Sequence, residues 1–168
     1  MGAVATSRVH LPDGAARRQA SDRIAKVDFG QLNHLLGYAI ARADIRADAT
    51  FHAAMSDRTV TPLRYAMLEL VGSNPGLHQV QLADALGVSR PAVTLLLDYW
   101  QTQGCVERCA TPFDRRSLDI FLTLPGDDRL AELRRRTRAQ DRQLSDPLTS
   151  AERAELARLL NKLGSFEK

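Results

Sequence analysis

Two short segments with helical apolar spacing, separated by a glycine, constrain the fold of this sequence more than any other feature. The first spans about residues 79–86, and Gly87 follows it where a left-handed helix cap is expected. The second follows Ser89, a good helix-capping residue, and Pro91 lies in its first turn, where proline is tolerated. The apolar residues of this second segment predict an inward stripe of Val93, Leu96, Leu97 and Trp100. We therefore expect two helices, about residues 79–86 and 89–103, joined by a tight turn.

Alternating apolar and polar residues follow this helix pair. Residues 105–108 alternate after Gly104, residues 117–122 alternate again, and the intervening residues 111–116 end in two arginines. This pattern predicts a β-hairpin with a long basic tip. Two short helices, a tight turn and a hairpin are the order of a winged helix-turn-helix, whose second helix is the right size to enter a DNA major groove.

Longer helical patterns flank this unit. On the N-terminal side we expect one helix over residues 28–55 and another from Thr61–Pro62 to about residue 73. On the C-terminal side we expect a polar, arginine-rich helix over residues 125–145, then a last helix opened by a capping box of Thr149 and Glu152. The apolar spacing of the first helix is carried by Leu32, Leu35, Leu36, Ala39, Ile40 and Ala43, and the apolar stripe of the last by Leu156, Leu159, Leu160 and Leu163. The second helix is expected to pack through Leu63, Met67, Leu70 and Val71. The predicted fold is mainly α.

Composition excludes several classes of protein. The chain has 168 residues, of which 44% are hydrophobic and 26% charged, as is typical of one soluble domain. Its apolar runs are too short to span a bilayer and no signal-like segment follows Met1, so we expect a cytoplasmic protein without a membrane partner. Cys105 and Cys109 complete neither a disulfide framework nor a zinc site, so no metal and no cofactor are expected. The four histidines, at 10, 34, 52 and 78, fit no catalytic or metal motif, and we expect no enzyme.

The net charge of +3 is concentrated at one end of the chain. Residues 1–27 contain five basic and two acidic residues, while the remaining chain is balanced. This segment also contains glycine and proline and little apolar periodicity, so we expect a mobile basic tail. Whether the tail is simply solvated or contacts DNA or a partner subunit stays open.

Four stretches carry a resemblance to a known family: residues 82–94 (LADALGVSRPAVT), 104–108 (GCVER), 112–116 (PFDRR) and 122–126 (LTLPG). Over residues 28–165 the chain resembles the MarR family of bacterial transcriptional regulators. The resemblance implies a homodimer that binds a palindromic operator in double-stranded DNA, with a ligand pocket between the dimer helices and the winged domain. It divides the chain into a tail (1–27) and a MarR-like domain (28–168), with dimerisation helices at 28–55 and 125–168 and the winged helix-turn-helix at 61–124.

The expected DNA contacts lie at the start of the second short helix and at the hairpin tip. A helix N-terminus attracts phosphate, and Ser89, Arg90 and Thr94 can donate hydrogen bonds there. Leu95 either contacts a thymine methyl group or packs under the wing. By the resemblance, the groove residues are Ser89, Arg90, Pro91, Ala92 and Thr94, and the wing is formed by Asp114, Arg115 and Arg116. We expect Asp114 to orient one of the two arginines rather than touch DNA.

A candidate effector site lies in the first helix. His34, Tyr38, Arg42 and Arg46 are four residues apart, which predicts a single helical strip. An arginine there can pair with a carboxylate, and His34 or Tyr38 can hydrogen-bond a phenol. Alternatively, these side chains are interface and surface residues. We add Arg64 and Tyr65 to this hypothetical site.

The segment Leu36-Gly37-Tyr38, with Arg42 after it, resembles the branch of the family that responds to hydroxycinnamate-type aromatic acids or their CoA thioesters. That resemblance implies a small aromatic carboxylate or its CoA thioester as the effector.

Two alternatives remain open. Some members of the family respond to cysteine oxidation, for which Cys109, beside Arg108, is a better candidate than the inward-facing Cys105. A winged helix can also serve as a protein-interaction module. His78 stands where the family tends to have a threonine cap, which predicts a weaker or pH-sensitive cap at that helix.

Overall fold

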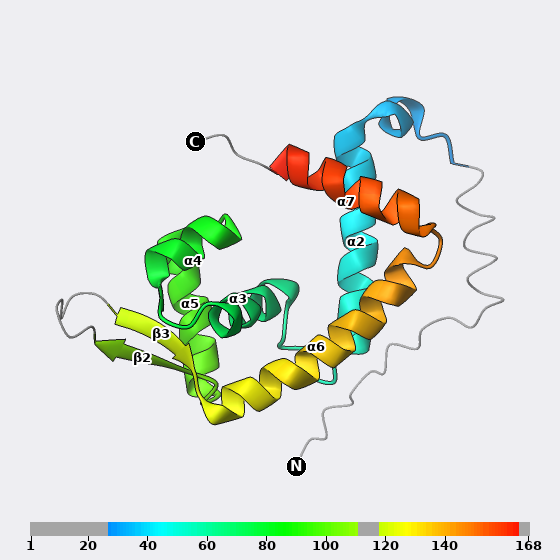
Figure 1. The fold of residues 1–168 in the computed structure, drawn as a ribbon. Helices are drawn as coiled ribbons and strands as arrows, with labels where there is room; N and C mark the ends of the chain where they lie inside the picture. The colour runs from blue at the N-terminus through cyan, green and yellow to red at the C-terminus, as the bar shows by residue number, and fades with distance from the viewer. Residues whose placement is uncertain (1–26, 111–117, 165–168) are drawn as a thin grey trace, which may run out of the picture. The chain divides into compact units, whose positions relative to one another are not determined.

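A computed structural model describes residues 27–110 and 118–164 (Figure 1). The chain divides into two units, residues 1–42 and 43–168. The expected basic tail, apart from Val27, and the expected wing residues Asp114, Arg115 and Arg116 lie outside the described residues.

The first unit does not contain the single uninterrupted helix that was predicted from residue 28. A short 3-10 helix, η1 (Gly30–His34), comes first, and α2 (Leu36–Ala54) begins only after Leu35, whose backbone is extended at φ −95° and ψ 116°. Gly30 has φ +52°, a conformation that favours glycine, and its N–H donates to Asp28 Oδ1 at 2.8 Å. This local turn was missed because apolar spacing does not report a change from 3-10 to α geometry.

The helices of the second unit follow the predicted order. They are the end of α2, then α3 (Pro62–Ser73), α4 (Gln79–Leu86), α5 (Arg90–Thr102), α6 (Leu124–Ser145) and α7 (Ser150–Gly164). Three of the predicted caps are present, and the side-chain cap expected of Ser89 is not. Thr61 Oγ1 accepts from the N–H of Arg64, and Gly87 is left-handed at φ +65°. At α7 the Thr149 N–H donates to Glu152 Oε2 at 2.8 Å, which confirms the capping box. The chemistry of the caps therefore explains where three of these helices begin or end.

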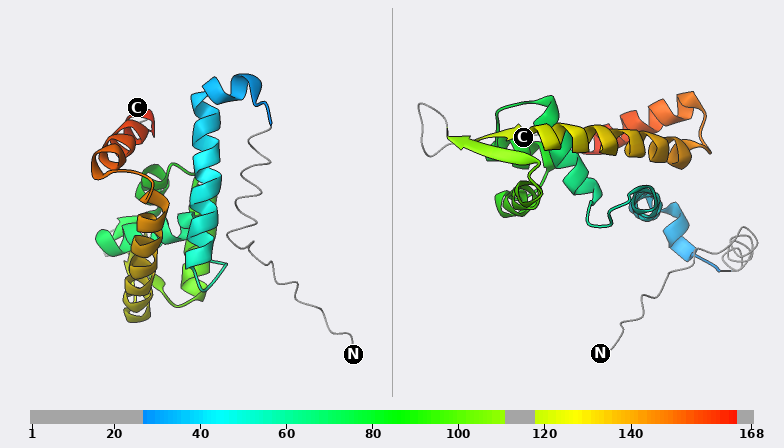
Figure 2. Two further views of the ribbon diagram at one scale, coloured as in Figure 1. Left: turned by 90° about the vertical axis from the view of Figure 1, so that its right-hand side faces the viewer. Right: turned by 90° about the horizontal axis from the view of Figure 1, so that it is seen from below.

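The sheet has three antiparallel strands, in the order β1-β3-β2. The predicted hairpin consists of β2 (Val106–Ala110) and β3 (Leu118–Leu122), and we call it the wing. The two strands lie side by side in Figure 1, and the right-hand view of Figure 2 shows the hairpin from below. The third strand, β1 (Leu77–His78), was not predicted. It pairs Leu77 with Ile120 and His78 with Asp119. A strand of two residues has no alternating pattern that a sequence could show. It is recognised only by its pairing with β3.

The core of the second unit forms where α3, α4 and α5 pack against the sheet and α6. The predicted stripe of α5 is confirmed, since all four of its residues are buried, and Trp100 Nε1 donates to the carbonyl oxygen of Arg64 at 2.9 Å. In α3, Met67 and Val71 are buried as predicted, but Leu63 is exposed and Leu68 is buried in its place. The other buried apolar side chains are Phe51, Met55, Val60, Leu82, Ala83, Cys105, Val106, Ile120, Leu130 and Leu133.

Two helices keep their apolar stripes exposed in the single chain. In α7 the four predicted leucines are 42–57% exposed. In the first unit Leu32, Leu35, Leu36 and Ile40, which carry the predicted apolar spacing, are also exposed. Within the described ranges no single helix is long and apolar enough to cross a membrane; α4 and α5 meet that criterion only together, as a pair bent by 109°.

Candidate DNA interface

The first turns of α5 present a continuous exposed surface. Ser89, Arg90, Pro91 and Thr94 are exposed and Ala92 is half-buried, as expected for residues on the side away from the core. Leu95 is 72% exposed, so it does not pack against the described strands of the wing, and that alternative is wrong. Ser89 occupies the N-cap position, but its side chain makes no capping hydrogen bond. Its hydroxyl and the first backbone N–H groups of α5 therefore point to solvent without a cap between them.

Gln79, which sequence reasoning missed, ties the start of α4 to the start of α5. Its Nε2 donates to the carbonyl oxygen of Arg90 at 3.1 Å and to Thr94 Oγ1 at 2.5 Å. The Thr94 hydroxyl in turn donates to the same Arg90 carbonyl at 3.2 Å. The prediction that Thr94 donates a hydrogen bond to DNA is therefore not what this geometry offers. No sequence signal links Gln79 to Thr94, because fifteen residues separate them.

Two further contacts hold the start of the helix pair and the far end of α5. Asp98 Oδ1 of α5 accepts from Arg108 Nη2 of β2 at 2.6 Å, which joins α5 to the wing. At the start of α4, the N–H of His78 donates to Gln81 Oε1 at 2.9 Å, and His78 Nδ1 lies 3.1 Å from Asp119 Oδ1. Gln81 thus supplies one half of a capping box at the start of α4.

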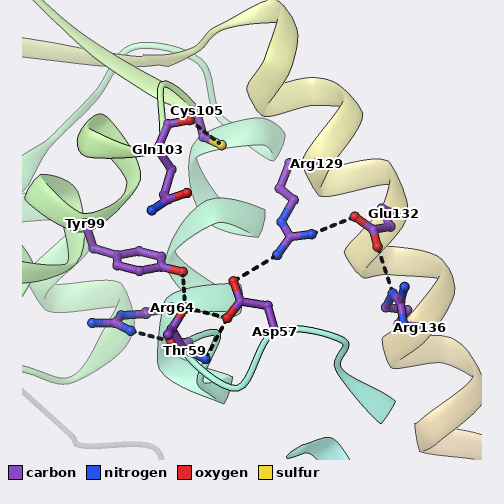
Figure 3. Close-up of polar contacts among 9 residues, drawn as sticks. All are labelled: Asp57, Thr59, Arg64, Tyr99, Gln103, Cys105, Arg129, Glu132 and Arg136. Atoms are coloured by element: carbon purple, nitrogen blue, oxygen red, sulfur yellow. Dashed lines mark hydrogen bonds and ion pairs between the residues drawn. The ribbon is translucent and has the colours of Figure 1, made fainter. Parts of the chain in front are cut away.

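A polar cluster connects α5 to α6 through the loop before α3 (Figure 3). We call it the Asp57 cluster; it consists of Asp57, Thr59, Arg64, Tyr99, Arg129, Glu132 and Arg136. The Thr59 hydroxyl donates to Asp57 Oδ1 at 2.7 Å, so the Tyr99 hydroxyl, 2.7 Å away, donates to Thr59. The Arg64 guanidinium lies 3.7 Å from the centre of the Tyr99 ring, a cation–π contact.

The α6 side of the Asp57 cluster is a chain of ion pairs. Arg129 Nη2 lies 3.4 Å from Asp57 Oδ2, and its Nη1 donates to Glu132 Oε2 at 2.7 Å. Arg136 joins Glu132 to the carbonyl oxygen of Ala54 at the end of α2. The cluster therefore sets the position of Tyr99, and with it α5, relative to α6 and the end of α2.

The candidate effector residues are divided between the two units. His34 lies in η1 and not on α2, so the predicted strip contains only Tyr38, Arg42 and Arg46. In the first unit the Arg42 guanidinium lies 5.5 Å from the Phe29 ring centre and 6.0 Å from that of Tyr38. Phe29 had not been singled out from the sequence. Arg46 is exposed one turn further along the helix.

The other two candidates, Arg64 and Tyr65, are held within the second unit. Arg64 belongs to the Asp57 cluster. Tyr65 is half-buried, and its hydroxyl donates to Glu69 Oε2 at 3.1 Å. Arg134 of α6 donates to both oxygens of Glu69, at 2.7 and 2.9 Å. The Arg134 guanidinium lowers the pKa of Glu69, and burial raises that of Tyr65.

Comparison with known proteins decides the family. A model described as the MarR family matches residues 59–117. A protein of Thauera aromatica, named for transcriptional regulation of the hcr operon, is 32% identical over 147 residues, which cover 87% of this chain and 89% of that protein. The chain belongs to the MarR family. MarR-family regulators bind DNA and are not enzymes, so the predicted fold class and the predicted non-enzymatic, DNA-binding role are confirmed.

Two solved structures of another MarR-type repressor, CouR, share the fold. CouR bound to a 23-mer DNA duplex has a TM-score of 0.78 and 31% identity, covering 83% of this chain and 99% of that one. CouR bound to p-coumaroyl-CoA has a TM-score of 0.76 and 27% identity, covering 84% and 100%. The relation therefore extends beyond the helix-turn-helix motif to most of both chains.

The cysteines of this MarR-family chain are poorly placed for redox sensing. Cys105 is buried, and burial raises the pKa of its thiol, which lowers the fraction of reactive thiolate. Cys109 is half-buried on β2, and the neighbouring Arg108 already pairs with Asp98. In the part of the chain that the structure describes, no group of His, Cys, Asp and Glu residues could hold a metal ion.

The Asp57 cluster makes stability depend on pH. Hydrogen bonds from the Thr59 side chain and backbone lower the pKa of Asp57 below its ordinary value of 3.8, and Arg129 adds to this. A lowered pKa in the folded state stabilises the protein above the unfolded-state pKa, and this contribution is lost as the pH falls through the folded-state value. Asp57→Asn is therefore expected to unfold at lower urea concentration than the wild type at pH 7, with the difference shrinking below about pH 4.

Asp128→Asn is the matched control for this prediction, because Asp128 is an exposed carboxylate of α6. Urea titrations at pH 7 and pH 3.5 on the three proteins give the comparison. A difference between wild type and Asp57→Asn that stays constant with pH would contradict the assignment.

Proposed function

We propose that this MarR-family chain is a homodimeric repressor that binds a palindromic operator and is released by a small aromatic carboxylate or its CoA thioester. The observation that carries the proposal is the exposed start of α5, whose opposite face is anchored in the core by Trp100 and its neighbours. CouR, which has this fold and 31% identity, binds a DNA duplex. In this proposal residues 61–124 form the DNA-binding part, and helices in 28–55 and 125–168 form the dimer.

On DNA, α5 lies in the major groove and the wing reaches the adjacent backbone or minor groove. Arg90 contacts a guanine edge, while Ser89 and the free N–H groups of the first turn hold a phosphate. Pro91 and Ala92 have short side chains, so the start of α5 can approach the DNA closely. Arg115 and Arg116 extend from the wing, with Asp114 orienting one of them.

The exposed apolar stripes support the homodimer. Leu156, Leu159, Leu160 and Leu163 form one face of α7, and a stripe of this size facing water is typical of an interface. The same holds for Leu35, Leu36 and Ile40 in the first unit. In the proposed dimer a second copy of the chain covers both faces.

Two observations support the effector assignment. CouR, at 27% identity over 84% of this chain, binds p-coumaroyl-CoA. In this chain Arg42 lies exposed beside the Phe29 and Tyr38 rings, a combination suited to an aromatic anion. His34, Arg46, Arg64 and Tyr65 remain candidates for the same ligand.

The test begins with selection of the operator from a randomised duplex pool. We expect an inverted repeat whose half-sites are about one helical turn apart. Adding p-coumarate, ferulate or either CoA thioester to the complex is expected to release the DNA with one of them. At 100 times its Kd that ligand stabilises the free protein by about 2.7 kcal/mol.

Free CoA is the control compound, because it lacks the aromatic acyl group. The binding site is tested with Arg42→Ala, and the exposed Arg135→Ala is its control variant. Fluorescence anisotropy reports release, and thermal unfolding reports binding. Failure of all four compounds, with release by a chemical of another class, would disprove the effector. Failure to select any DNA sequence would disprove the operator.

A further inference from the structure

The hydroxyl of Thr94 is engaged inside the protein although the residue is exposed. Its proton is donated to the carbonyl oxygen of Arg90 at 3.2 Å, and its oxygen accepts from Gln79 Nε2 at 2.5 Å. A hydroxyl has a single proton to donate. Thr94 therefore has no donor left for the acceptors of a guanine or adenine edge.

We infer that Thr94 reads thymine, through its methyl group, and that Gln79 is the residue that turns this methyl group toward the DNA. With Oγ1 held against the helix, the methyl carbon is the part of this exposed side chain left to face a ligand. Thymine is the base that places a methyl group in the major groove. The inference rests on the proposed function, in which the start of α5 enters that groove.

The neighbouring residue extends the same apolar surface. Leu95 follows Thr94 and is 72% exposed, whereas the next two residues, Leu96 and Leu97, are buried. Thr94 and Leu95 together offer the groove a surface suited to methyl groups rather than to hydrogen-bonding edges. In this arrangement Arg90 is the residue at the start of α5 that recognises a base through hydrogen bonds.

Gln79 acts as a positioning residue in this arrangement. Its Nε2 donates to two acceptors on α5, the Arg90 carbonyl and Thr94 Oγ1. Rotation of the Thr94 side chain would break the bond from Gln79 and the bond that the hydroxyl donates to the Arg90 carbonyl. Without Gln79 the hydroxyl keeps only the bond to Arg90 and is freer to turn toward an acceptor on a base. Removal of Gln79 should therefore change which base is preferred, rather than only weaken binding.

The experiment replaces each thymine of the selected operator, one at a time, by deoxyuridine, which removes only the methyl group. For the wild type we expect binding about fourfold weaker at one thymine in each half-site, the loss expected for one buried methylene-sized group. Thr94→Val keeps a methyl group and should retain this penalty. Thr94→Ser keeps the hydroxyl but lacks the methyl, and should bind both duplexes equally. Gln79→Leu should reduce the penalty.

Thr102→Val and Thr102→Ser are matched controls, since the Thr102 hydroxyl makes the same kind of bond, to the Asp98 carbonyl at 2.7 Å, at the far end of α5. Both should leave the penalty unchanged. A penalty that persists in Thr94→Ser and disappears in Leu95→Ala would overturn the assignment, as would the absence of any penalty in the wild type. Each of these results is obtained with an operator that the protein has selected. If the proposed function fails, no DNA sequence is selected, so the two failures can be told apart.

Discussion

Gly126→Ala is expected to destabilise the fold by about 3 kcal/mol or more, the upper end of the range for overpacking. Gly126 lies in the first turn of α6, and a Cβ atom there would collide with the carbonyl oxygen of Cys105 and lie 3.2 Å from its Cα. The backbone of Cys105 cannot easily shift away from this Cβ atom, because it is held by hydrogen bonds on both sides. The Cys105 oxygen accepts from the Thr123 N–H at 3.1 Å, and the Cys105 N–H donates to the Trp100 oxygen at 2.8 Å.

Thermal or urea unfolding measures this loss, which corresponds to a fall in Tm of at least about 6 °C. Gly164→Ala is the matched control, because Gly164 is the last residue of α7 and has open space where a Cβ would be. It should be neutral or stabilising by up to about 1 kcal/mol. An unchanged Tm for Gly126→Ala would show that the end of α5 and the start of α6 do not approach as closely as described.

Arg90→Ala is expected to weaken operator binding by about 1–3 kcal/mol for each half-site, and a symmetric dimer loses this twice. Arg90 is exposed at the first position of α5 and its carbonyl, not its guanidinium, is engaged by Gln79 and Thr94. The side chain is therefore available to a guanine edge. The variant should lose preference at one base position per half-site and keep its weaker binding to unrelated DNA.

Arg135→Ala removes the same charge from an exposed position on α6 and separates a specific contact from a change in net charge. Anisotropy titrations on the operator, on single-base variants and on unrelated duplex give the comparison. An equal loss on all sequences, with a salt slope lower by about one unit for each arginine, would instead make Arg90 a phosphate contact.

Local physical chemistry determined much of this protein in advance. The stripe of α5, the left-handed Gly87, the Thr61 cap and the Thr149–Glu152 capping box are decided by residues a few positions apart, so the sequence predicts them directly. The order of the helices and the hairpin along the chain was sufficient to predict the winged helix-turn-helix and the exposed start of α5. The break at Leu35 and the strand β1 were missed because each depends on only a few residues without periodicity.

The tertiary structure decided what the side chains of the candidate site can do. Thr94 has a free donor in the sequence and none in the fold, because its proton is donated to the Arg90 carbonyl oxygen while Gln79, on another helix, donates to its oxygen. In the same way the guanidinium of Arg64 lies over the ring of Tyr99, thirty-five positions away, a contact that no local pattern predicts. Periodicity and capping report which face of a helix is buried. The partner of a polar group comes from a distant part of the chain, and only the packing of the helices brings that partner within hydrogen-bond distance.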